Sequence, residues 1–260
     1  MKNRARSFNS ISELYHQFRL GYPTEMYDEI RRICNPPRNL KILEIGVGTG
    51  TATKEIVQQF SPELTALEPG TQLCKLGKEL FSGEESVRFV CSGFEEYAKD
   101  SQYNWIVSAT AFHWIDPLIK FEKAASLLDD NGFLIVWTNN YSRDDSPVFE
   151  DIAEIYEKLH PNGSPEDGDI RRIQTEKIVA RDQEISNSLW FNHCYHKVFE
   201  RNIPLTGDKY IGLLKTFSNN ISLPEKQLES FYLAIEASIE RHGGFINLPV
   251  KTSLTIAKKT

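Results

Sequence analysis

The amino-acid sequence predicts an α/β protein with a doubly wound, mostly parallel sheet of seven strands. Short apolar runs recur through the first half of the chain, and stretches with apolar residues at helical spacing separate them. Glycine, proline or a polar residue follows most of these runs. Strands that alternate with helices in this way are typical of an open parallel sheet with helices on both faces.

The composition is that of a folded globular protein. Of the 260 residues, 40% are hydrophobic and 25% are charged, and the net charge is −6. A mildly acidic chain does not favour the basic face of a nucleic-acid binder, so we expect no nucleic-acid partner. No stretch approaches the ~20 apolar residues of a membrane helix. The start of the chain also lacks the apolar core of a signal peptide, so we expect no membrane partner.

The four cysteines are far apart in the sequence and form no C-x-x-C pair: Cys34, Cys74, Cys91 and Cys194. This spacing favours the reduced thiols of a cytoplasmic protein over a disulfide framework or a zinc site. We therefore expect a cytoplasmic protein without a bound metal.

Two predicted helices open the chain. The first is centred on Ile11, Tyr15 and Phe18, and the second covers Thr24–Cys34 with apolar residues at helical spacing. Asn35 and the two prolines after it end the second helix.

A glycine-rich turn follows the first predicted strand. Leu40–Ile45 is the nearly continuous apolar run of a strand buried on both faces. Gly46, Gly48 and Gly50 come next. Glycine tolerates positive φ and has no Cβ, so the backbone can turn tightly there and lie against a ligand, beside the free N–H groups of the next helix. The alternative is a plain strand-to-helix turn that needs small residues only for packing.

The next three predicted strands end in loops that we expect at the same edge of the sheet. Leu64–Glu68 places a carboxylate about twenty residues beyond the glycine turn, where nucleotide-binding α/β folds hold a ribose hydroxyl. A solvent-exposed acid is the alternative. Ser86–Cys91 is followed by the loop at 92–94, and Tyr103–Ala109 opens into residues 110–114. Ligands in such sheets bind outside the carboxyl ends of the strands.

Two helices connect these strands. Thr71–Phe81 is the first, and the second begins at Asp116 and ends at Asn131 and Gly132. The fifth predicted strand is the apolar run Phe133–Trp137.

The second half of the chain is less regular, and we interpret residues 140–193 as a mainly helical cap. It holds helices at 148–160 and 169–184, separated by a loop at 161–168. The sheet resumes with an alternating strand at 194–203. Two more helices then lead, through a bend at Pro249, into a last strand at 253–257. The core domain is thus predicted at 1–139 and 194–260.

The motifs on these elements resemble those of class I S-adenosylmethionine-dependent methyltransferases. Residues 44–50, Glu-Ile-Gly-Val-Gly-Thr-Gly, match the acidic-x-Gly-x-Gly-x-Gly motif of that family, and Thr51 stands where a dinucleotide fingerprint would have its third glycine. Residues 103–114 and 15–23 are similar to motifs of the type 11 subgroup, which includes trans-aconitate and juvenile-hormone-acid methyltransferases. The resemblance spans nearly the whole chain and implies a Rossmann-like methyltransferase fold.

The resemblance also implies where the cofactor S-adenosylmethionine is held. It would contact the opening segment, the glycine turn and the loops after three strands: Tyr15, Arg19, Glu44, Gly46, Gly48, Thr49, Gly50, Glu68, Pro69, Ser92, Gly93, Phe94, Ala109, Thr110 and Trp114. Helices within residues 1–37 would close over the cofactor, with Arg19 against its carboxylate. Two positions depart from the family pattern: Asn104 and Ser92 stand where Asp is common.

Methyl transfer depends chiefly on positioning the two reactants and excluding water. A carboxylate acceptor needs no general base, whereas a hydroxyl or a protonated amine needs one. His113 is the candidate for that catalytic role, and the alternative is that it only shapes the pocket. We expect a monomeric or homodimeric enzyme that methylates an O or N atom of a small molecule, with organic acids among the candidates. A catalytically silent cofactor-binding protein and an RNA methyltransferase are the alternatives.

Overall fold

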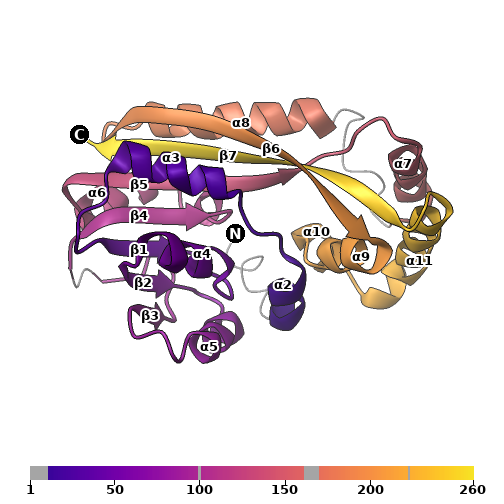
Figure 1. The fold of residues 1–260 in the computed structure, drawn as a ribbon, viewed down its shortest axis with the longest axis horizontal. Helices are drawn as coiled ribbons and strands as arrows, with labels where there is room; N and C mark the ends of the chain where they lie inside the picture. Colours follow the sequence, from indigo (N-terminus) through magenta and orange to yellow (C-terminus); the bar gives the residue numbers. More distant parts are fainter. Residues whose placement is uncertain (1–10, 99–100, 161–169, 222) are drawn as a thin grey trace.

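The computed structural model describes residues 11–98, 101–160, 170–221 and 223–260. It contains a seven-stranded sheet with the strand order β3-β2-β1-β4-β5-β7-β6 (Figure 1). The strands β1 to β5 pair in parallel, and β7 is antiparallel to both of its neighbours. The predicted fold class, a doubly wound and mostly parallel sheet, is therefore confirmed.

The strand bounds are β1 Lys41–Ile45, β2 Glu63–Leu67, β3 Val87–Val90, β4 Tyr103–Ala109, β5 Leu128–Tyr141, β6 Phe191–Thr206 and β7 Phe245–Lys259. The helices of the first half are α2 Ser12–Phe18, α3 Thr24–Cys34, α4 Thr51–Phe60, α5 Thr71–Leu80, the single 3₁₀ turn η2 Phe112–Trp114, and α6 Lys120–Leu127. Those of the second half are α7 Pro147–Leu159, α8 Ile170–Ser186, α9 Gly207–Lys215, α10 Ser218–Ile221 and α11 Glu225–Arg241.

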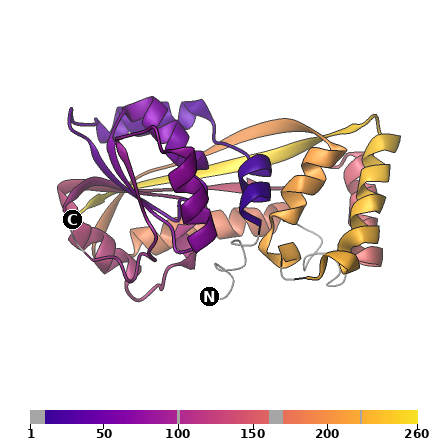
Figure 2. The ribbon, with the colours of Figure 1, turned by 90° about the horizontal axis from the view of Figure 1, so that it is seen from below.

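Successive side chains of the central strands point to opposite faces of the sheet, and this divides the core into two layers. Ile42 lies beside Trp105 on one face of the sheet, where α3, α4 and α5 cover them. The next residues, Leu43 and Ile106, point to the other face, where α6 and α8 pack. The two helical layers lie on opposite sides of the sheet in Figure 2. Because apolar residues occupy both faces, the central strands read as continuous apolar runs.

A third apolar cluster lies beyond this sheet body, at the far ends of β6 and β7 (Figure 1). It joins α7, α9 and α11, with Phe231, Ile235 and Leu213 at its centre. The short helix α2 contacts α9 and lies between the sheet body and this helical layer. The predicted loop at 161–168 lies outside the described residues.

The predicted bend at Pro249 is wrong, because β7 is one continuous strand of 15 residues. Proline has no N–H to give to a ladder. Pro249 lies just past Val250, which forms the last β7 pair with β5, so the missing donor breaks no β5 ladder bond. Its carbonyl accepts a hydrogen bond of 3.0 Å from the Ser142 N–H.

The helix predicted from Asp116 is shorter than expected. The Asp116 carboxylate accepts the N–H of Leu118 at 3.0 Å, which makes a turn, and α6 begins only at Lys120. Leu118 is 86% exposed and does not belong to the apolar stripe of the helix. The helix ends at Leu127, so β5 starts earlier than the predicted Phe133.

The prediction of reduced thiols is wrong for two of the cysteines. Cys74 and Cys91 form a disulfide, although 17 residues separate them. Parallel pairing of β3 with β2 returns the chain beside α5, which brings the two Cα atoms to 5.6 Å. Cys34 is buried and does not take part in this disulfide. No helix in the described ranges combines the length and the apolarity needed to cross a membrane.

Candidate functional site

A cavity of about 1480 Å³ opens at the carboxyl ends of the parallel strands, between the sheet body and the helical layer of α7 and α9. Its wall contains most of the predicted site residues: Tyr15, Arg19, Gly46, Gly48, Glu68, Pro69, Ser92, Gly93, Phe94, Ala109, Thr110, His113 and Trp114. Glu44, Thr49 and Gly50 are not among the described residues that line it. Cavities for one small ligand usually measure ~300–1,000 Å³, so this one has room for two.

The turn after β1 requires glycine at two points that face the cavity. Gly46 has φ +70°, and a Cβ there would lie 2.3 Å from the Cβ of Ala111 in the loop after β4. Gly48 has φ +60°, and its Cβ would lie 3.2 Å from the Tyr15 ring. The turn is therefore held tightly between α2 and the β4 loop.

Glu68 connects the glycine turn to the start of α5. One carboxylate oxygen accepts the N–H of Gly48, and the other accepts the N–H of Gly70, both at 2.8 Å. Burial raises the pKa of Glu68, and the two N–H groups oppose that rise. Each carboxylate oxygen has two lone pairs, so Glu68 keeps the capacity to accept hydroxyl groups from a ligand in the cavity.

Glu44 lies behind the turn. It is buried, and its Oε2 accepts the Thr53 hydroxyl at 2.8 Å. Burial raises its pKa to about 8. The other carboxylate oxygen and the hydroxyl of Thr49 are buried without a hydrogen-bond partner. The structure thus places these two residues behind the turn, where they support it.

The loop after β3 forms another part of the wall. The Ser92 hydroxyl donates to the Gly93 carbonyl at 3.0 Å, and Phe94 packs into the apolar layer below. Leu73 of α5 lies on the cavity wall as well. A flat apolar group between Leu73 and this loop would leave polar groups at its edge, as an adenine ring requires.

Arg19 extends from the end of α2 to the far side of the cavity. Its Nη2 donates to the Thr216 carbonyl at 2.7 Å, and its guanidinium lies 4.9 Å from the Tyr15 ring and 5.3 Å from the Phe217 ring. Its Nε is buried without a partner. Because Arg19 lines the cavity, its guanidinium suits a ligand carboxylate.

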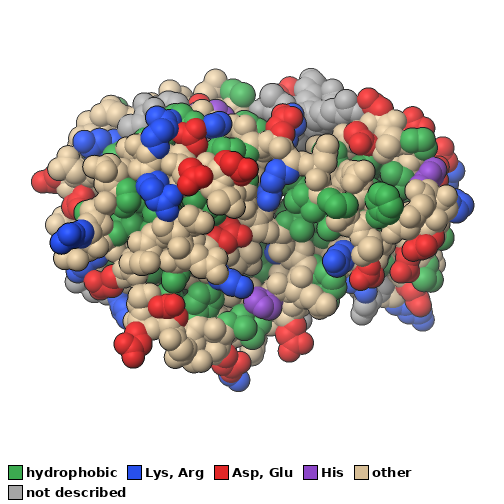
Figure 3. Space-filling view, in the orientation of Figure 1, with side chains coloured by type: hydrophobic (Ala, Val, Ile, Leu, Met, Phe, Trp, Pro, Cys, Tyr) green, Lys and Arg blue, Asp and Glu red, His purple; other side chains and the backbone are tan. Residues whose placement is uncertain are grey.

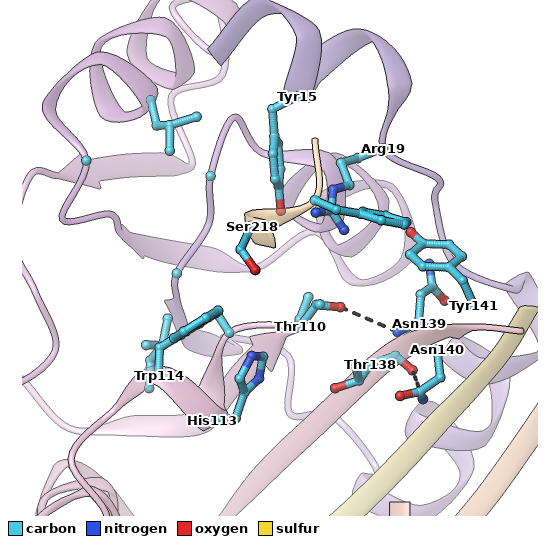
Figure 4. A pocket seen from close by; sticks show the side chains of 18 of the residues that line it. Tyr15, Arg19, Thr110, His113, Trp114, Thr138, Asn139, Asn140, Tyr141 and Ser218 are labelled. Atoms are coloured by element: carbon cyan, nitrogen blue, oxygen red, sulfur yellow. Dashed lines mark hydrogen bonds between the residues drawn. The ribbon is translucent and has the colours of Figure 1, made fainter. Parts of the chain in front are cut away.

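Thr110 is a strained residue at the centre of the site (Figure 4). Its φ is +58°, a conformation that β-branched residues rarely adopt. Its hydroxyl lies 3.3 Å from the Tyr22 hydroxyl and 3.4 Å from the Asn139 N–H. Strain of this kind persists where the surroundings fix it, most often at functional sites.

His113 and Trp114 stand on the η2 turn after β4, with ring centroids 4.7 Å apart. The imidazole is exposed toward the cavity, but protein surrounds it on its other sides. Burial, reinforced by the positive charges of Arg181 and Lys120, lowers the pKa of His113 to about 4. The ring is therefore neutral at physiological pH, and it is a weak base.

The end of β5 and the arginines near it are site features that the sequence did not predict. Thr138, Asn139, Asn140 and Tyr141 line the cavity (Figure 4). Arg143 and Arg181 line it as well. The Nη1 of Arg181 donates to the Asn140 Oδ1 at 3.3 Å. The signal in the sequence was the polar run Thr-Asn-Asn-Tyr, which comes directly after the apolar residues of the predicted fifth strand. This is the edge of the sheet where the other site loops lie.

Charged side chains divide the cavity into two regions. The acids Glu68, Glu95, Glu96 and Asp116 come from the loops after β2, β3 and β4. The arginines Arg19, Arg143 and Arg181 come from the segments after α2 and β5 and from α8. A ligand with hydroxyl groups fits the first region, and anionic groups fit the second. The described residues contain no group of three or more His, Cys, Asp or Glu side chains suited to a metal ion.

One family model matches part of the chain. Residues 42–132 match the family model described as "Methyltransferase domain". This range runs from β1 into the start of β5 and includes the glycine turn, Glu68 and His113.

Two curated relatives are similar to part of the chain. A Dictyostelium discoideum protein named as a methyltransferase is 31% identical over 132 residues, which is 50% of this chain and 48% of that protein. A Saccharomyces cerevisiae protein named as an S-adenosylmethionine-dependent methyltransferase is 23% identical over 58% of this chain and 52% of its own length. The chain therefore spans about half the length of the curated relatives it matches.

A solved structure extends the likeness in fold to nearly the whole chain. The structure of a type II methyltransferase from Anaeromyxobacter dehalogenans has a TM-score of 0.63 and 17% sequence identity. The match covers 93% of this chain and 97% of that one.

Proposed function

We propose that this chain, which carries a class I S-adenosylmethionine-dependent methyltransferase domain, is an active enzyme that methylates the carboxylate of a small organic acid. The family model and the fold support the class of the domain and its cofactor, S-adenosylmethionine. The acceptor, the site residues and the subgroup predicted from residues 15–23 and 103–114 are part of the proposal.

The residues of the cavity fit the cofactor. The guanidinium of Arg19 would bind its carboxylate, and the oxygens of Glu68 would accept its ribose hydroxyls. Leu73 and the loop at 92–94 would hold the adenine. When bound, the cofactor supplies a methyl group on a sulfonium; the carbon–sulfur bond breaks as a carbon–oxygen bond forms, and the electron pair stays on sulfur as a neutral thioether.

The surroundings of Arg181 are the main support for a carboxylate acceptor. Among the described residues its guanidinium donates one hydrogen bond, to Asn140, although it has five N–H donors. It lies close enough to His113 to lower the pKa of that ring. A carboxylate near Arg181 could therefore receive charge-assisted hydrogen bonds while His113 remains neutral.

The low basicity of His113 supports the same choice. A hydroxyl or protonated amine would have to lose a proton, and a base with a pKa of about 4 removes protons poorly at neutral pH. A carboxylate is already ionised, so it needs only to be positioned and shielded from water. His113 then lines the acceptor site and offers it a hydrogen-bonding group.

We also propose how the layers enclose the two ligands. Helix α2 would close over the cofactor, since Tyr15 and Arg19 both line the cavity. The cap over the acceptor, predicted at 140–193, would extend to α9 and α11, because they share one apolar cluster with α7. The enzyme would be cytoplasmic and monomeric or homodimeric. Lys, Arg, Asp and Glu are interspersed on the face in Figure 3, which favours a small acceptor over a nucleic acid.

Release of S-adenosylhomocysteine from a panel of carboxylic acids, alcohols and amines tests this function. We expect turnover with acids, and a loss of roughly 10- to 150-fold in kcat/KM for Arg181→Gln, because hydrogen bonds to charged groups contribute about 1.5–3 kcal/mol. Calorimetry should show unchanged S-adenosylhomocysteine binding to that variant. Arg38→Gln, at an exposed site outside the cavity, is the matched control. Turnover of alcohols or amines alone would contradict the proposal.

A further inference from the structure

The half of the cavity beneath α7 and α9 differs in chemistry from the half at the strand ends. Its wall includes Phe149, Ile152 and Tyr156 from α7, Tyr210 and Leu213 from α9, and Leu248 from β7. We call this half the apolar chamber. Every described lining residue that these three elements contribute is uncharged.

The chamber is a fixed part of the helical layer. Phe149, Ile152, Tyr210, Leu213 and Leu248 belong to one buried apolar cluster, and each is less than 9% exposed. Burial raises the pKa of Tyr210, so its phenol stays neutral. Removal of apolar ligand surface from water is therefore the main gain that this half can offer.

The arginines of the cavity lie at the border between its two halves. Tyr141 at the end of β5 stacks on Phe217 with ring centroids 5.4 Å apart, and Arg19 lies 5.3 Å from the Phe217 ring. Arg143 follows β5, and Arg181 is hydrogen-bonded to Asn140 of the same strand. The cationic region thus lies between the strand-end half and the apolar chamber.

From this arrangement we infer that the acceptor is an amphipathic monocarboxylic acid, whose apolar tail occupies the chamber while its carboxylate lies in the arginine region. The inference rests on the proposed function and specifies its substrate class. A compact di- or tricarboxylic acid would place charge against Ile152 and Leu213 or leave the chamber unused, and burial of an unpaired charge is costly.

A series of linear saturated monocarboxylates from butanoate to dodecanoate tests the chamber. Each methylene that enters it should raise kcat/KM roughly fourfold until the chamber is full. Calorimetry of the same acids, in the presence of S-adenosylhomocysteine, should show affinity that rises with chain length. A flat profile in both measurements would overturn the inference.

Ala153 offers a direct way to fill the chamber. It lines the cavity from α7 and is only partly buried, so a larger side chain there can point into the space. Ala153→Phe should reduce kcat/KM for decanoate at least tenfold and leave butanoate within twofold. Ala237→Phe, which adds the same bulk at an exposed position on α11, is the matched control. Equal effects of Ala153→Phe on both acids would contradict the chamber.

The two proposals fail in different ways. Chain-length-dependent binding without turnover of any acid would retain the chamber and reject the carboxyl methyltransferase. Turnover that favours short or multiply charged acids would retain the methyltransferase and reject the chamber.

Discussion

The Glu68 carboxylate accepts the N–H of Gly48 at 2.8 Å, across 20 residues of sequence. Its second oxygen holds the N–H of Gly70 at the same distance, so one side chain fixes the turn after β1 and the start of α5 together. Both segments line the cavity, and the geometry of the proposed ribose site therefore depends on Glu68.

Glu68→Gln should weaken S-adenosylhomocysteine binding roughly 10- to 100-fold. The amide keeps the shape of the carboxylate, but its NH₂ group must face one of the two backbone donors, and a buried donor without an acceptor costs about 1–3 kcal/mol. Isothermal titration calorimetry measures the change. Glu63→Gln, at the exposed start of β2, should bind as the wild type does. Unchanged affinity in Glu68→Gln would show that the carboxylate does not organise the site.

Gly46→Ala should abolish cofactor binding through a contact that a second mutation can relieve. The new Cβ would lie 2.3 Å from the Cβ of Ala111. The alanine would also be strained, because the backbone at this position has φ +70°. In the double variant Gly46→Ala/Ala111→Gly, the nearest heavy atom would be the Cα of residue 111 at 3.8 Å.

The double variant should therefore recover part of the binding and of the melting temperature. The remaining loss reflects the left-handed backbone, which costs about 1–2 kcal/mol for a residue with a Cβ. Gly83→Ala is the control, because a Cβ there has no neighbour within 4 Å. Equal defects in the single and double variants would mean that the contact with Ala111 is not limiting.

The rate with an acid acceptor should show no step from the titration of His113 between pH 6 and pH 9. The pKa of His113 is about 4, so the ring is neutral throughout that range and no titration of it enters kcat/KM. The folded-state pKa lies below the ordinary value of ~6.5, so the unfolded chain binds more protons between these values. Stability therefore falls as the pH drops from about 6.5 to about 4.

His113→Asn keeps a polar group at this position and should retain most of kcat, with its larger effect in KM. Its melting temperature should also depend less on pH between 4 and 6.5 than that of the wild type. A rate that rises with pH through an apparent pKa near 7, and that His113→Asn abolishes, would identify His113 as a general base instead.

The sequence was most informative where one strand leads into one loop. The apolar run at 40–45 and the three glycines predicted β1 and its turn, because burial on both faces and positive φ leave a local pattern. Glu68 was predicted at a strand tip for the same reason. Its contact with Gly48 depends on the pairing of β1 with β2, which no local pattern reports.

The features that the sequence did not predict depend on tertiary context. The sequence predicts a bend at Pro249, but β5 stops pairing with β7 at Val250, so the missing N–H of Pro249 breaks no β5 ladder bond. Arg181 approaches Asn140 only because α8 packs along β6 and β7. The apolar chamber combines α7 and α9, which lie about fifty residues apart in the chain and meet at the ends of two long strands.

The Cys74–Cys91 disulfide joins α5 to the residue after β3, and both segments form the wall proposed for the adenine. Closing a loop of this length contributes about 3 kcal/mol by restricting the unfolded chain. A reductant should therefore release two additional thiols per chain and lower the melting temperature by roughly 6–12 °C.

Cys91→Ala separates the bond from other effects of the reductant. Cys91 is exposed toward the cavity, so its replacement removes little packing, whereas Cys74 is fully buried. The variant should melt at the temperature of the reduced wild type, and the reductant should change it no further. Because Ser92 and Gly93 follow directly, S-adenosylhomocysteine affinity should fall in the reduced wild type and in Cys91→Ala by the same factor. If the reductant lowers the melting temperature of Cys91→Ala as well, the lost stability belongs to another site, and the disulfide does not hold the adenine wall in place.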